Sequence, residues 1–416
     1  MSNSGWREVK LGEVCSKIGS GSTPTGGANA YCDSGIALIR SQNILDFKFS
    51  DVGLTYINKI QAKKLNNVTI EEGDVLLNIT GDSVARCCIV PKDILPARVN
   101  QHVAIIRGLQ ENVDNRYILY YLQHNKTYLL SIAGIGGTRN ALTKKMIENL
   151  YIKLPPINEQ KAIAGTLSCL DDKIELNNRI NKNLEEMAQA IFKSWFIDFE
   201  PFQNGEFEDS ELGRIPKGWR IFSISEIFEI NPSRRIPRGT IAPYLDMSNM
   251  PTTGHAPKKW IERVVGSGMK FINGDTLVAR ITPCLENGKT AYVDFLGNNQ
   301  VGWGSTEYLV IRPRSPISTI FAYILARSDR FRDYAIKRMT GSSGRQRVPA
   351  DNIGLFKIVL PPLESIIHKD FTVFVESLFI FMRVLTFESR KLVQIRDTLL
   401  PKLMSGEIRV PLEEVQ

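Results

Sequence analysis

Residues that build catalytic and metal centres are scarce in this sequence. Only four histidines occur among its 416 residues, and they are scattered without an H-E-x-x-H pair, so no metal site is predicted. The Gly288-Lys289 pair lacks the earlier glycine of a phosphate-binding loop, because Pro283 stands in its place. The run "NPSR" at 231–234 lacks the second proline and the aromatic residue of the methyltransferase motif Asn-Pro-Pro-aromatic. These absences favour binding over catalysis.

Paired C-x-x-C cysteines and long apolar runs are also missing. The six cysteines form no C-x-x-C pair and no signal peptide precedes them, which predicts reduced, mostly buried thiols in a cytoplasmic protein. The most apolar stretch, 371–385, contains Glu376 and Arg383 and is too short to span a bilayer. We therefore expect no membrane partner, and we interpret this stretch as the buried face of a helix.

The composition is that of a globular protein with a basic balance. Hydrophobic residues make up 43% of the chain and charged residues 23%, and its length favours two or three domains. The formal net charge of +8 suits a polyanionic partner such as nucleic acid, although many basic proteins never bind one.

The chain contains an internal repeat. Four segments recur in the same order at offsets of roughly 205 residues, which chance does not explain. The pairs are "GWREVKLGEV" (5–14) with "GWRIFSISEI" (218–227), "EEGDVLLNIT" (71–80) with "INGDTLVARIT" (272–282), "NQHVAIIR" (100–107) with "STEYLVIR" (305–312), and "GGTRNALTKKMIENLYIKLPP" (136–156) with "SSGRQRVPADNIGLFKIVLPP" (342–362). The chain is therefore two copies of one unit, each a globular part followed by a long helix.

Each globular part has an α+β pattern. Short β-like runs such as "VLLNIT" and "YLVIR" are separated by Gly, Asn, Asp and Pro. One stretch of helical periodicity lies late in each part, at 116–133 and at 319–339. An acidic, non-periodic linker at 199–219 follows the first long helix and marks a domain boundary.

Two long helices are predicted by apolar residues at alternating spacings of four and three. The first series is Ile163, Leu167, Leu170, Ile174, Asn177, Asn181, Leu184, Ala188, Ile191 and Trp195, and the second is Ile367, Phe371, Phe374, Leu378, Phe381, Leu385, Glu388, Leu392, Ile395 and Leu399. Neither helix can bury such a stripe alone, so we expect an antiparallel coiled coil. The polar residues Asn177, Asn181 and Glu388 fix the register of the pair or form a water-facing patch, and the sequence leaves both interpretations open.

Polar loops close each unit and are rich in basic residues. In the second copy Arg345, Gln346 and Arg347 follow a basic helix. Arg and Lys neutralise phosphates, Arg pairs with guanine edges, and Asn or Gln pairs with adenine. The glycine-rich run at 18–27 also suits a DNA-facing loop better than a nucleotide site. The alternative for the helical arginines is a solvated basic face.

Several segments together resemble the specificity subunit of a type I restriction-modification system. They are "LPPINEQKAIA" (154–164), "NLEEMAQAIFKSWFIDFEPF" (183–202), "LGRIPKGW" (212–219) and "LLPKLMSGEIRV" (399–410). The resemblance covers nearly the whole chain. One departure is that the second Pro-Pro pair is followed by "LESIIH" instead of a sequence like "INEQ", so the resemblance does not define where the second helix starts.

The resemblance implies two similar globular α/β target recognition domains joined by two long antiparallel coiled-coil helices. The implied boundaries are 1–156 and 217–362 for the domains, 157–198 and 363–404 for the spacer helices, 199–216 for a linker and 405–416 for a C-terminal tail. Each domain would recognise one half of a gapped site in double-stranded DNA in a prokaryotic cytoplasm. Two methylation subunits and the restriction subunits would be the partners, and they would carry S-adenosylmethionine, ATP and magnesium. This chain would then bind no cofactor and catalyse nothing.

The resemblance also implies which loops face DNA. In the first unit these are Thr23, Pro24, Arg40, Ser41, Gln42, Asn43, Thr80, Gly81, Asn100, Gln101, His102, Thr138, Arg139 and Asn140. In the second unit they are Arg234, Arg235, Ser248, Asn249, Arg280, Thr282, Thr306, Arg345, Gln346 and Arg347. A rival hypothesis from another class is a protein-interaction scaffold, with two β-rich modules on a coiled coil and no role at DNA.

Overall fold

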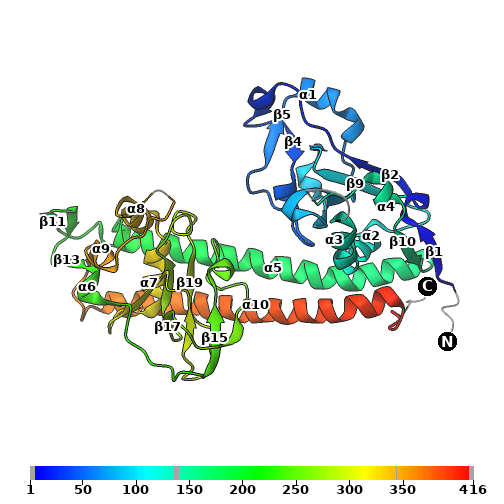
Figure 1. The fold of residues 1–416 in the computed structure, drawn as a ribbon. Coiled ribbons are helices and arrows are strands. Elements are labelled where there is room, and N and C mark those ends of the chain that lie inside the picture. Colours follow the sequence, from blue (N-terminus) through cyan, green and yellow to red (C-terminus); the bar gives the residue numbers. More distant parts are fainter. Residues whose placement is uncertain (1–4, 135–139, 343, 412–416) are drawn as a thin grey trace. The chain divides into compact units, whose positions relative to one another are not determined.

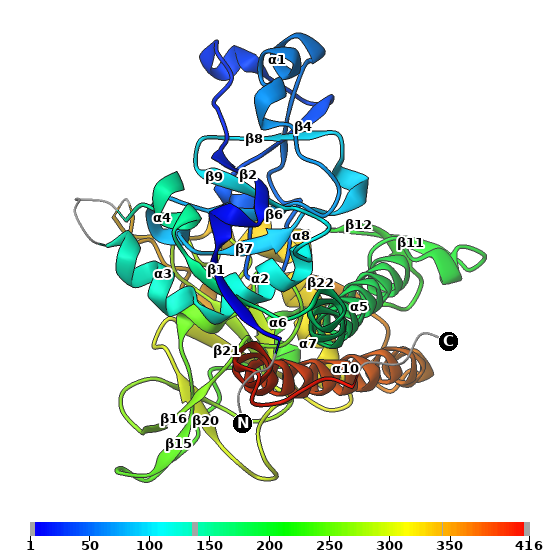
Figure 2. The same ribbon diagram turned by 90° about the vertical axis from the view of Figure 1, so that its right-hand side faces the viewer.

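The computed structural model describes residues 5–134, 140–342 and 344–411, and these form two compact units. The first unit comprises Met1–Ile174 and Arg390–Gln416, and the second comprises Glu175–Ser389. Figures 1 and 2 show the elements of each unit from two directions. Among the residues described, no helix combines the length and the apolar character that crossing a bilayer requires.

Two helices of 40 residues each contribute to both units. They are α5 (Ile157–Phe196) and α10 (Ile366–Ser405). The first unit holds the beginning of α5 and the end of α10, and the second unit holds the remainder of each, so the two helices run antiparallel. The helix α10 begins three residues after the predicted position 363. Ser365 Oγ accepts the N–H of Ile367 at 3.3 Å, and this capping bond sets the start of the helix.

The first unit contains ten strands and four short helices among its described residues. Its strands are β1 (Arg7–Lys10), β2 (Cys15–Ser20), β3 (Tyr31–Cys32), β4 (Ile36–Ile39), β5 (Thr55–Ile57), β6 (Val75–Asn78), β7 (Cys87–Ile89), β8 (Ala97–Val99), β9 (Val103–Gly108) and β10 (Tyr151–Leu154). Its helices are α1 (Lys59–Lys64), α2 (Asn115–His124), α3 (Lys126–Ala133) and α4 (Lys144–Glu148). They build one sheet of order β2-β9-β6-β7, a second of order β3-β5-β4-β8 and the pair β1-β10.

The strands β6 and β9 are buried on both faces, because successive side chains of a strand point to opposite sides. Val75 and Leu77 pack with α2 and the long helices, whereas Leu76 packs with the second sheet. In β9, Ile106 and Ile105 divide between the same two clusters. This explains the continuous apolar runs in the sequence, and it makes these two strands the central layer of the unit.

The second unit repeats this plan. Its strands are β11 (Phe207–Ser210), β12 (Gly213–Pro216), β13 (Arg220–Ser223), β14 (Phe228–Ile230), β15 (Ile241–Leu245), β16 (Ile261–Val264), β17 (Met269–Phe271), β18 (Thr276–Ala279), β19 (Thr290–Tyr292), β20 (Gly302–Gly304), β21 (Tyr308–Pro313) and β22 (Lys357–Leu360). Its helices are α6 (Ile224–Ile227), α7 (Thr319–Arg327), α8 (Asp329–Lys337) and α9 (Ala350–Gly354). The sheets have the orders β14-β21-β18-β19 and β16-β15-β20-β17, and β13 pairs with β22.

The two predicted helical stretches are each interrupted at the same place. The stretch 116–133 is divided into α2 and α3 at Asn125, and the stretch 319–339 is divided into α7 and α8 at Ser328. Ser328 Oγ accepts the N–H of Phe331 at 3.3 Å, so the serine caps the second helix of its pair. The interruption is a shared feature of the repeated unit that periodicity alone does not reveal.

The apolar seam of α5 lies where the spacing predicts, and that of α10 does so except at Phe374, Phe381 and Ile395, which are exposed. Every predicted seam residue of α5 is buried or half-buried. In α10, however, Phe374 and Phe381 are 55% and 47% exposed, while Val375 and Met382 are fully buried. Phe374 and Phe381 were wrong as buried positions because α10 also packs on the globular part of the second unit, where Phe371 contacts Phe321. The ring of Phe374 still lies 5.9 Å from that of Trp195 on α5. A helix with two neighbours buries a wider face than a two-stranded seam.

Polar side chains pair across the two helices inside the second unit. Asn177 is fully buried, and its Nδ2 donates to Glu388 Oε2 at 2.8 Å and to Ser389 Oγ at 3.2 Å. Asn181 Nδ2 donates to Thr386 Oγ1 at 3.1 Å. These bonds favour the register interpretation over a water-facing patch, because a shift of either helix would break all of them.

Candidate nucleic-acid interface

Three segments meet at one end of the central strands in the first unit. The strands β6 and β9 are antiparallel, so the residues after β6 adjoin those before β9. A third segment, 140–142, lies beside them, since Ala141 forms a β-bridge with Thr80 and Gly81 N–H donates to Asn140 O at 3.1 Å. Ile79 N–H donates to the backbone oxygen of the residue at position 102 at 3.0 Å, which closes the group. Backbone atoms therefore hold the three loops together.

The second unit has the same backbone arrangement. Ile281 forms the bridge with Arg347, and Thr282 N–H donates to Gln346 O at 3.0 Å. Arg280 N–H donates to Glu307 O at 3.0 Å. We call each set of these bonds the loop frame. Its bonds make the following positions equivalent: Gly81 and Thr282, His102 and Glu307, Asn140 and Gln346, Ala141 and Arg347.

On the frame of the first unit, four predicted side chains form one polar network. Thr80 Oγ1 and His102 Nδ1 are 2.7 Å apart, Gln101 Nε2 is 3.1 Å from His102 Nε2, and Thr23 bonds to Gln101. Both ring nitrogens of His102 therefore have a polar partner within hydrogen-bond distance. Asn100 Oδ1 supports the turn by accepting His102 N–H at 3.1 Å. Thr23 and Gln101 are exposed, so the network ends at the surface.

On the frame of the second unit, the equivalent positions carry an ion pair. Arg347 Nε and Nη2 donate to Glu307 at distances from 2.7 to 3.0 Å, and Arg347 Nη1 donates to Arg345 O at 3.2 Å. Hydrogen bonding to Glu307 raises the pKa of Arg347. The Nε of Arg280 is buried and has no hydrogen-bond partner in the described chain. Thr306, which precedes Glu307 in the sequence, is exposed. Sequence reasoning missed Glu307.

The predicted segment 40–43 lies in a loop with its own internal bonds. Arg40 Nη2 and Gln42 Nε2 both donate to Gly53 O, at 2.8 and 3.0 Å. Ser41 O accepts Nδ2 of Asn78, the last residue of β6, at 2.8 Å. The loop is therefore anchored to the same strand end as the loop frame.

Two predicted residues lie behind the surface, and two lie outside the described chain. Asn43 is fully buried and its Nδ2 donates to Ser50 O at 2.9 Å, so it supports the fold of its loop. Pro24 is also buried. Any contribution of these two residues to DNA binding would be indirect. Thr138 and Arg139 fall within 135–139, outside the described residues.

The predicted Arg234 is engaged inside the second unit. Its side chain is 9% exposed, and its guanidinium lies 2.8 Å from the fully buried carboxylate of Asp275. Arg312 contacts the same carboxylate at 2.6 Å. Burial raises the pKa of Asp275, and the Ile272 N–H and both guanidiniums oppose that effect. Arg234 thus balances a buried charge, whereas the neighbouring Arg235 is exposed.

The predicted Ser248 and Asn249 form a turn with an acidic residue that precedes them. Asp246 accepts the hydroxyl of Ser248 at 2.5 Å and the side-chain amide of Asn249 at 2.7 Å. Ser248 is exposed and Asn249 is half-buried. Both side chains therefore donate hydrogen bonds within the turn. Their contacts with DNA stay predictions.

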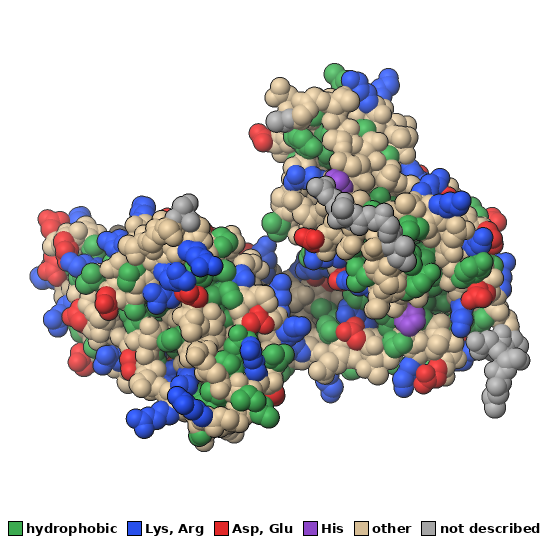
Figure 3. Space-filling model, in the orientation of Figure 1, with side chains coloured by type: hydrophobic (Ala, Val, Ile, Leu, Met, Phe, Trp, Pro, Cys, Tyr) green, Lys and Arg blue, Asp and Glu red, His purple; other side chains and the backbone are tan. Residues whose placement is uncertain are grey.

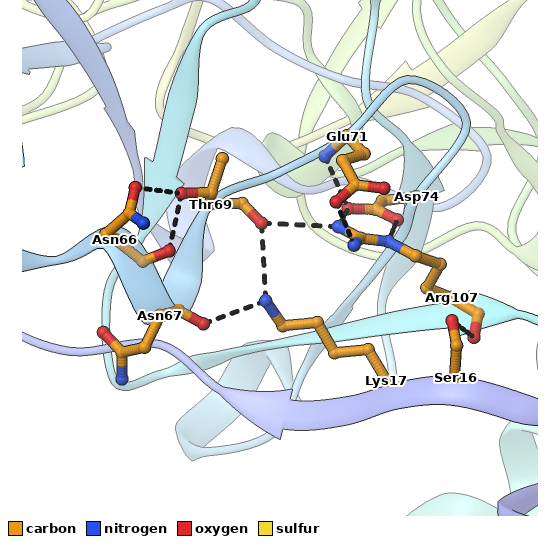
Figure 4. Close-up of polar contacts among 8 residues, drawn as sticks. All are labelled: Ser16, Lys17, Asn66, Asn67, Thr69, Glu71, Asp74 and Arg107. Carbon is orange, nitrogen blue, oxygen red and sulfur yellow. Dashed lines mark hydrogen bonds and ion pairs between the residues drawn. The ribbon is translucent and has the colours of Figure 1, made fainter.

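A buried aspartate anchors the strands of each loop frame at the opposite end. In the first unit Asp74 is fully buried, and Arg107 Nε and Nη2 donate to it at 2.7 Å (Figure 4). Arg107 also bonds to Glu71, and Asp74 accepts the N–H of Glu71 at 2.7 Å. The pair Asp275 and Arg312 repeats this arrangement. Sequence reasoning noted the repeated segments but not this pairing, whose signal is a Gly-Asp before one strand and an Ile-Arg near the end of the next.

The site has the chemistry of a binding surface. Within the described ranges, no group of three or more His, Cys, Asp or Glu residues could hold a metal ion. Lys and Arg side chains are spread over the drawn face of each unit (Figure 3). The helical Arg327 is not part of a solvated face, because its Nη1 donates to Thr252 O and Gly288 O at 2.9 Å. Donors and acceptors on the loop frames suit base edges and phosphates.

Comparison with known proteins places both halves of the chain in one family. The model of the type I restriction modification DNA specificity domain matches residues 3–186 and again 216–395. The MjaIX specificity subunit of Methanocaldococcus jannaschii is 28% identical, over 97% of this chain and 94% of its own. The HindI specificity subunit of Haemophilus influenzae is 24% identical, over 97% and 100%. A crystal structure of the type I S subunit from M. genitalium shares the fold, with 16% identity, a TM-score of 0.58 and 97% of each chain covered.

Proposed function

The chain belongs to the family of type I restriction-modification DNA specificity domains, and on this basis we propose that it selects the DNA sequence on which a restriction-modification complex acts. Each unit recognises one half of a gapped double-stranded site. The family and its relatives give no support to the rival hypothesis of a scaffold without a role at DNA.

One observation carries this proposal: the same loop frame occurs in both units with different side chains on it. Backbone bonds fix the loops in the same way, while His102 is replaced by Glu307 and Ala141 by Arg347. A constant backbone frame that carries different polar side chains suits two units that recognise different half-sites, because base edges differ in their donors and acceptors.

The outer face of α10 supports docking of a helical protein partner. Ile366, Val373 and Ile380 recur every seventh residue and are 62%, 63% and 65% exposed, and Val384 on the same side is 57% exposed. This stripe is separate from the buried one that faces α5. A helix with two apolar stripes suits a bundle of more than two helices. We assign this face to the methylation subunits, two of them because the unit is repeated.

Catalysis and cofactors belong to the partners in this proposal. The methylation subunits bind S-adenosylmethionine and modify adenine, and restriction subunits that use ATP and magnesium join them. The target base must leave the helix stack to be methylated, and this chain orients the subunit that extrudes it.

The proposal is tested by co-expressing the chain with the methyltransferase encoded beside its gene in a host without DNA methylation. Long-read sequencing then reports adenine methylation. We expect a gapped two-part motif that disappears when this chain is omitted. Methylation that persists without the chain, or none when both proteins are soluble, would reject the proposal.

A further inference from the structure

The equivalent positions 102/307 and 141/347 distinguish the two loop frames. In the first unit they hold the hydrogen-bonded His102 and an alanine, and in the second they hold the Glu307–Arg347 ion pair. The backbone bonds of the frame are the same in both units. The ion pair is therefore not needed to close the frame, since the first unit closes it without one.

The geometry of this pair leaves a defined edge of the guanidinium for a ligand. Glu307 engages Arg347 from the side, through Nε and Nη2, and the backbone oxygen of Arg345 accepts one N–H of Nη1. A guanidinium has five N–H groups, one on Nε and two on each terminal nitrogen. Three are used, so Nη1 and Nη2 each keep one N–H. The side chain of Arg347 is 40% exposed, which lets this edge reach a ligand.

We infer that Arg347 recognises a guanine in the half-site of the second unit, and that Glu307 is the residue that positions it. This inference rests on the proposed function. The remaining N–H groups on Nη1 and Nη2 match the O6 and N7 acceptors that guanine presents in the major groove. No other base offers two acceptors there, because adenine replaces O6 with a donor.

A purely stabilising role explains the pair less well. Exposed ion pairs contribute little to stability, and this one lies at the surface with Arg347 40% and Glu307 23% exposed. A carboxylate beside a DNA-binding loop also repels phosphates. Its presence is explained if it holds a planar guanidinium in one orientation, because a fixed fork loses less conformational entropy on binding.

The nearby Arg345 provides the contrast. Its side chain is exposed and makes no hydrogen bond or ion pair within the described part of the chain. A flexible arginine of this kind suits a phosphate contact, which adds affinity without sequence information. The two arginines therefore have separate tasks, and replacing one or the other distinguishes them.

The experiment uses the complex of this chain with its neighbouring methyltransferase. The motif of the wild-type complex is determined by sequencing, and the same is done for Arg347→Ala and Arg347→Lys. In one half-site a guanine should become degenerate, with discrimination reduced about ten- to a hundredfold. The lysine variant keeps the charge but loses the two-pronged geometry, so it should lose specificity as well. An unchanged motif, or a half-site without guanine, would overturn the inference.

Three variants serve as controls. Arg345→Ala removes the same charge two positions away and should weaken binding without changing the motif. Gln101→Ala in the first unit should relax the other half-site.

Glu307→Gln should lower discrimination for guanine while binding to unrelated DNA is kept or strengthened, because a negative charge is lost. If Glu307→Gln leaves discrimination intact, Glu307 has no positioning role.

A base analogue gives a readout that a structural defect would not produce. Substituting 7-deazaguanine at the identified position removes the N7 acceptor alone. Wild-type complex should bind this DNA about tenfold more weakly than normal DNA, and Arg347→Ala should bind both equally. Equal losses in both proteins would contradict the assignment. If the wild-type complex produces no gapped motif, the proposed function itself fails, which is distinguishable from a motif that Arg347 does not affect.

Discussion

At the scale of single residues, the buried aspartates fix where the loop frames lie. Asp74 and Asp275 are both fully buried, and each pairs with an arginine. Each also accepts a backbone N–H from the residue three positions before it. The pair Asp74 and Arg107 connects β6 to β9 at one end, and the loop frame connects them at the other. Damage to the anchor should therefore affect the whole unit.

Replacing Asp74 by alanine should destabilise the chain by about 3 kcal/mol, because the partner guanidinium stays partly buried without its main carboxylate. Thermal unfolding measures the loss. Glu72→Ala is the matched control: Glu72 pairs with Lys92 at the surface, and its loss should cost less than about 1 kcal/mol. Adding Arg107→Met to Asp74→Ala should restore part of the stability. Equal effects of the two single variants would contradict the anchoring role.

The candidate site was only partly predictable from single residues. The polar network of Thr80, Gln101 and His102 falls on predicted positions because loops with amides and hydroxyls are visible in the sequence. Glu307 was missed because a carboxylate in a basic region suggests no DNA contact, and its meaning depends on Arg347, which lies far along the chain. Burial of Asn43 depends on tertiary packing, which composition does not reveal.

At the scale of elements, the long helices show where periodicity succeeds and where it fails. The spacing in α5 predicts its seam correctly, although α5 also packs on the globular part of the second unit, where Phe192 contacts Phe321. The spacing in α10 supports two stripes, and the sequence alone does not say which of them faces inward. Phe374 and Phe381, whose size made them attractive core candidates, are exposed, although Phe374 lies beside Trp195 of α5. Packing of α10 on the globular part decides the matter.

The register interpretation of the seam predicts a stability cost at Asn177. Replacing Asn177 by alanine removes hydrogen bonds to Glu388 and Ser389 and should lower the free energy of unfolding by about 1–2 kcal/mol. Asn178→Ala is the control, since Asn178 is exposed on the same helix and should change stability by less than about 0.5 kcal/mol. Denaturant unfolding of both variants makes the comparison. If Asn177→Ala does not lower the free energy of unfolding, the water-facing patch is the better interpretation.

At the scale of the whole molecule, the long helices are proposed to set the gap between the half-sites. Inserting four residues into each helix adds about one turn, or roughly 6 Å. At about 3.4 Å per base pair, the gap in the methylated motif should lengthen by about two base pairs. Motif sequencing measures the gap directly.

The linker provides a control for this prediction. Four residues inserted after Asn204, in an exposed turn between α5 and β11, lengthen the chain without lengthening either helix. The gap should then stay as it is. If the gap is unchanged by the helix insertions, or if it lengthens with the linker insertion, the helices do not set the distance between the half-sites.

The backbone origin of the loop frames has a consequence for how such proteins change over generations. Because main-chain atoms hold the loops, side chains such as those at 102 and 307 are free to differ without unfolding their unit. A few substitutions at these positions can then create a new recognition preference in one step. Foreign DNA that has lost the old target sequence would then be recognised by a descendant protein that prefers a different sequence. The fold of that descendant would be unchanged.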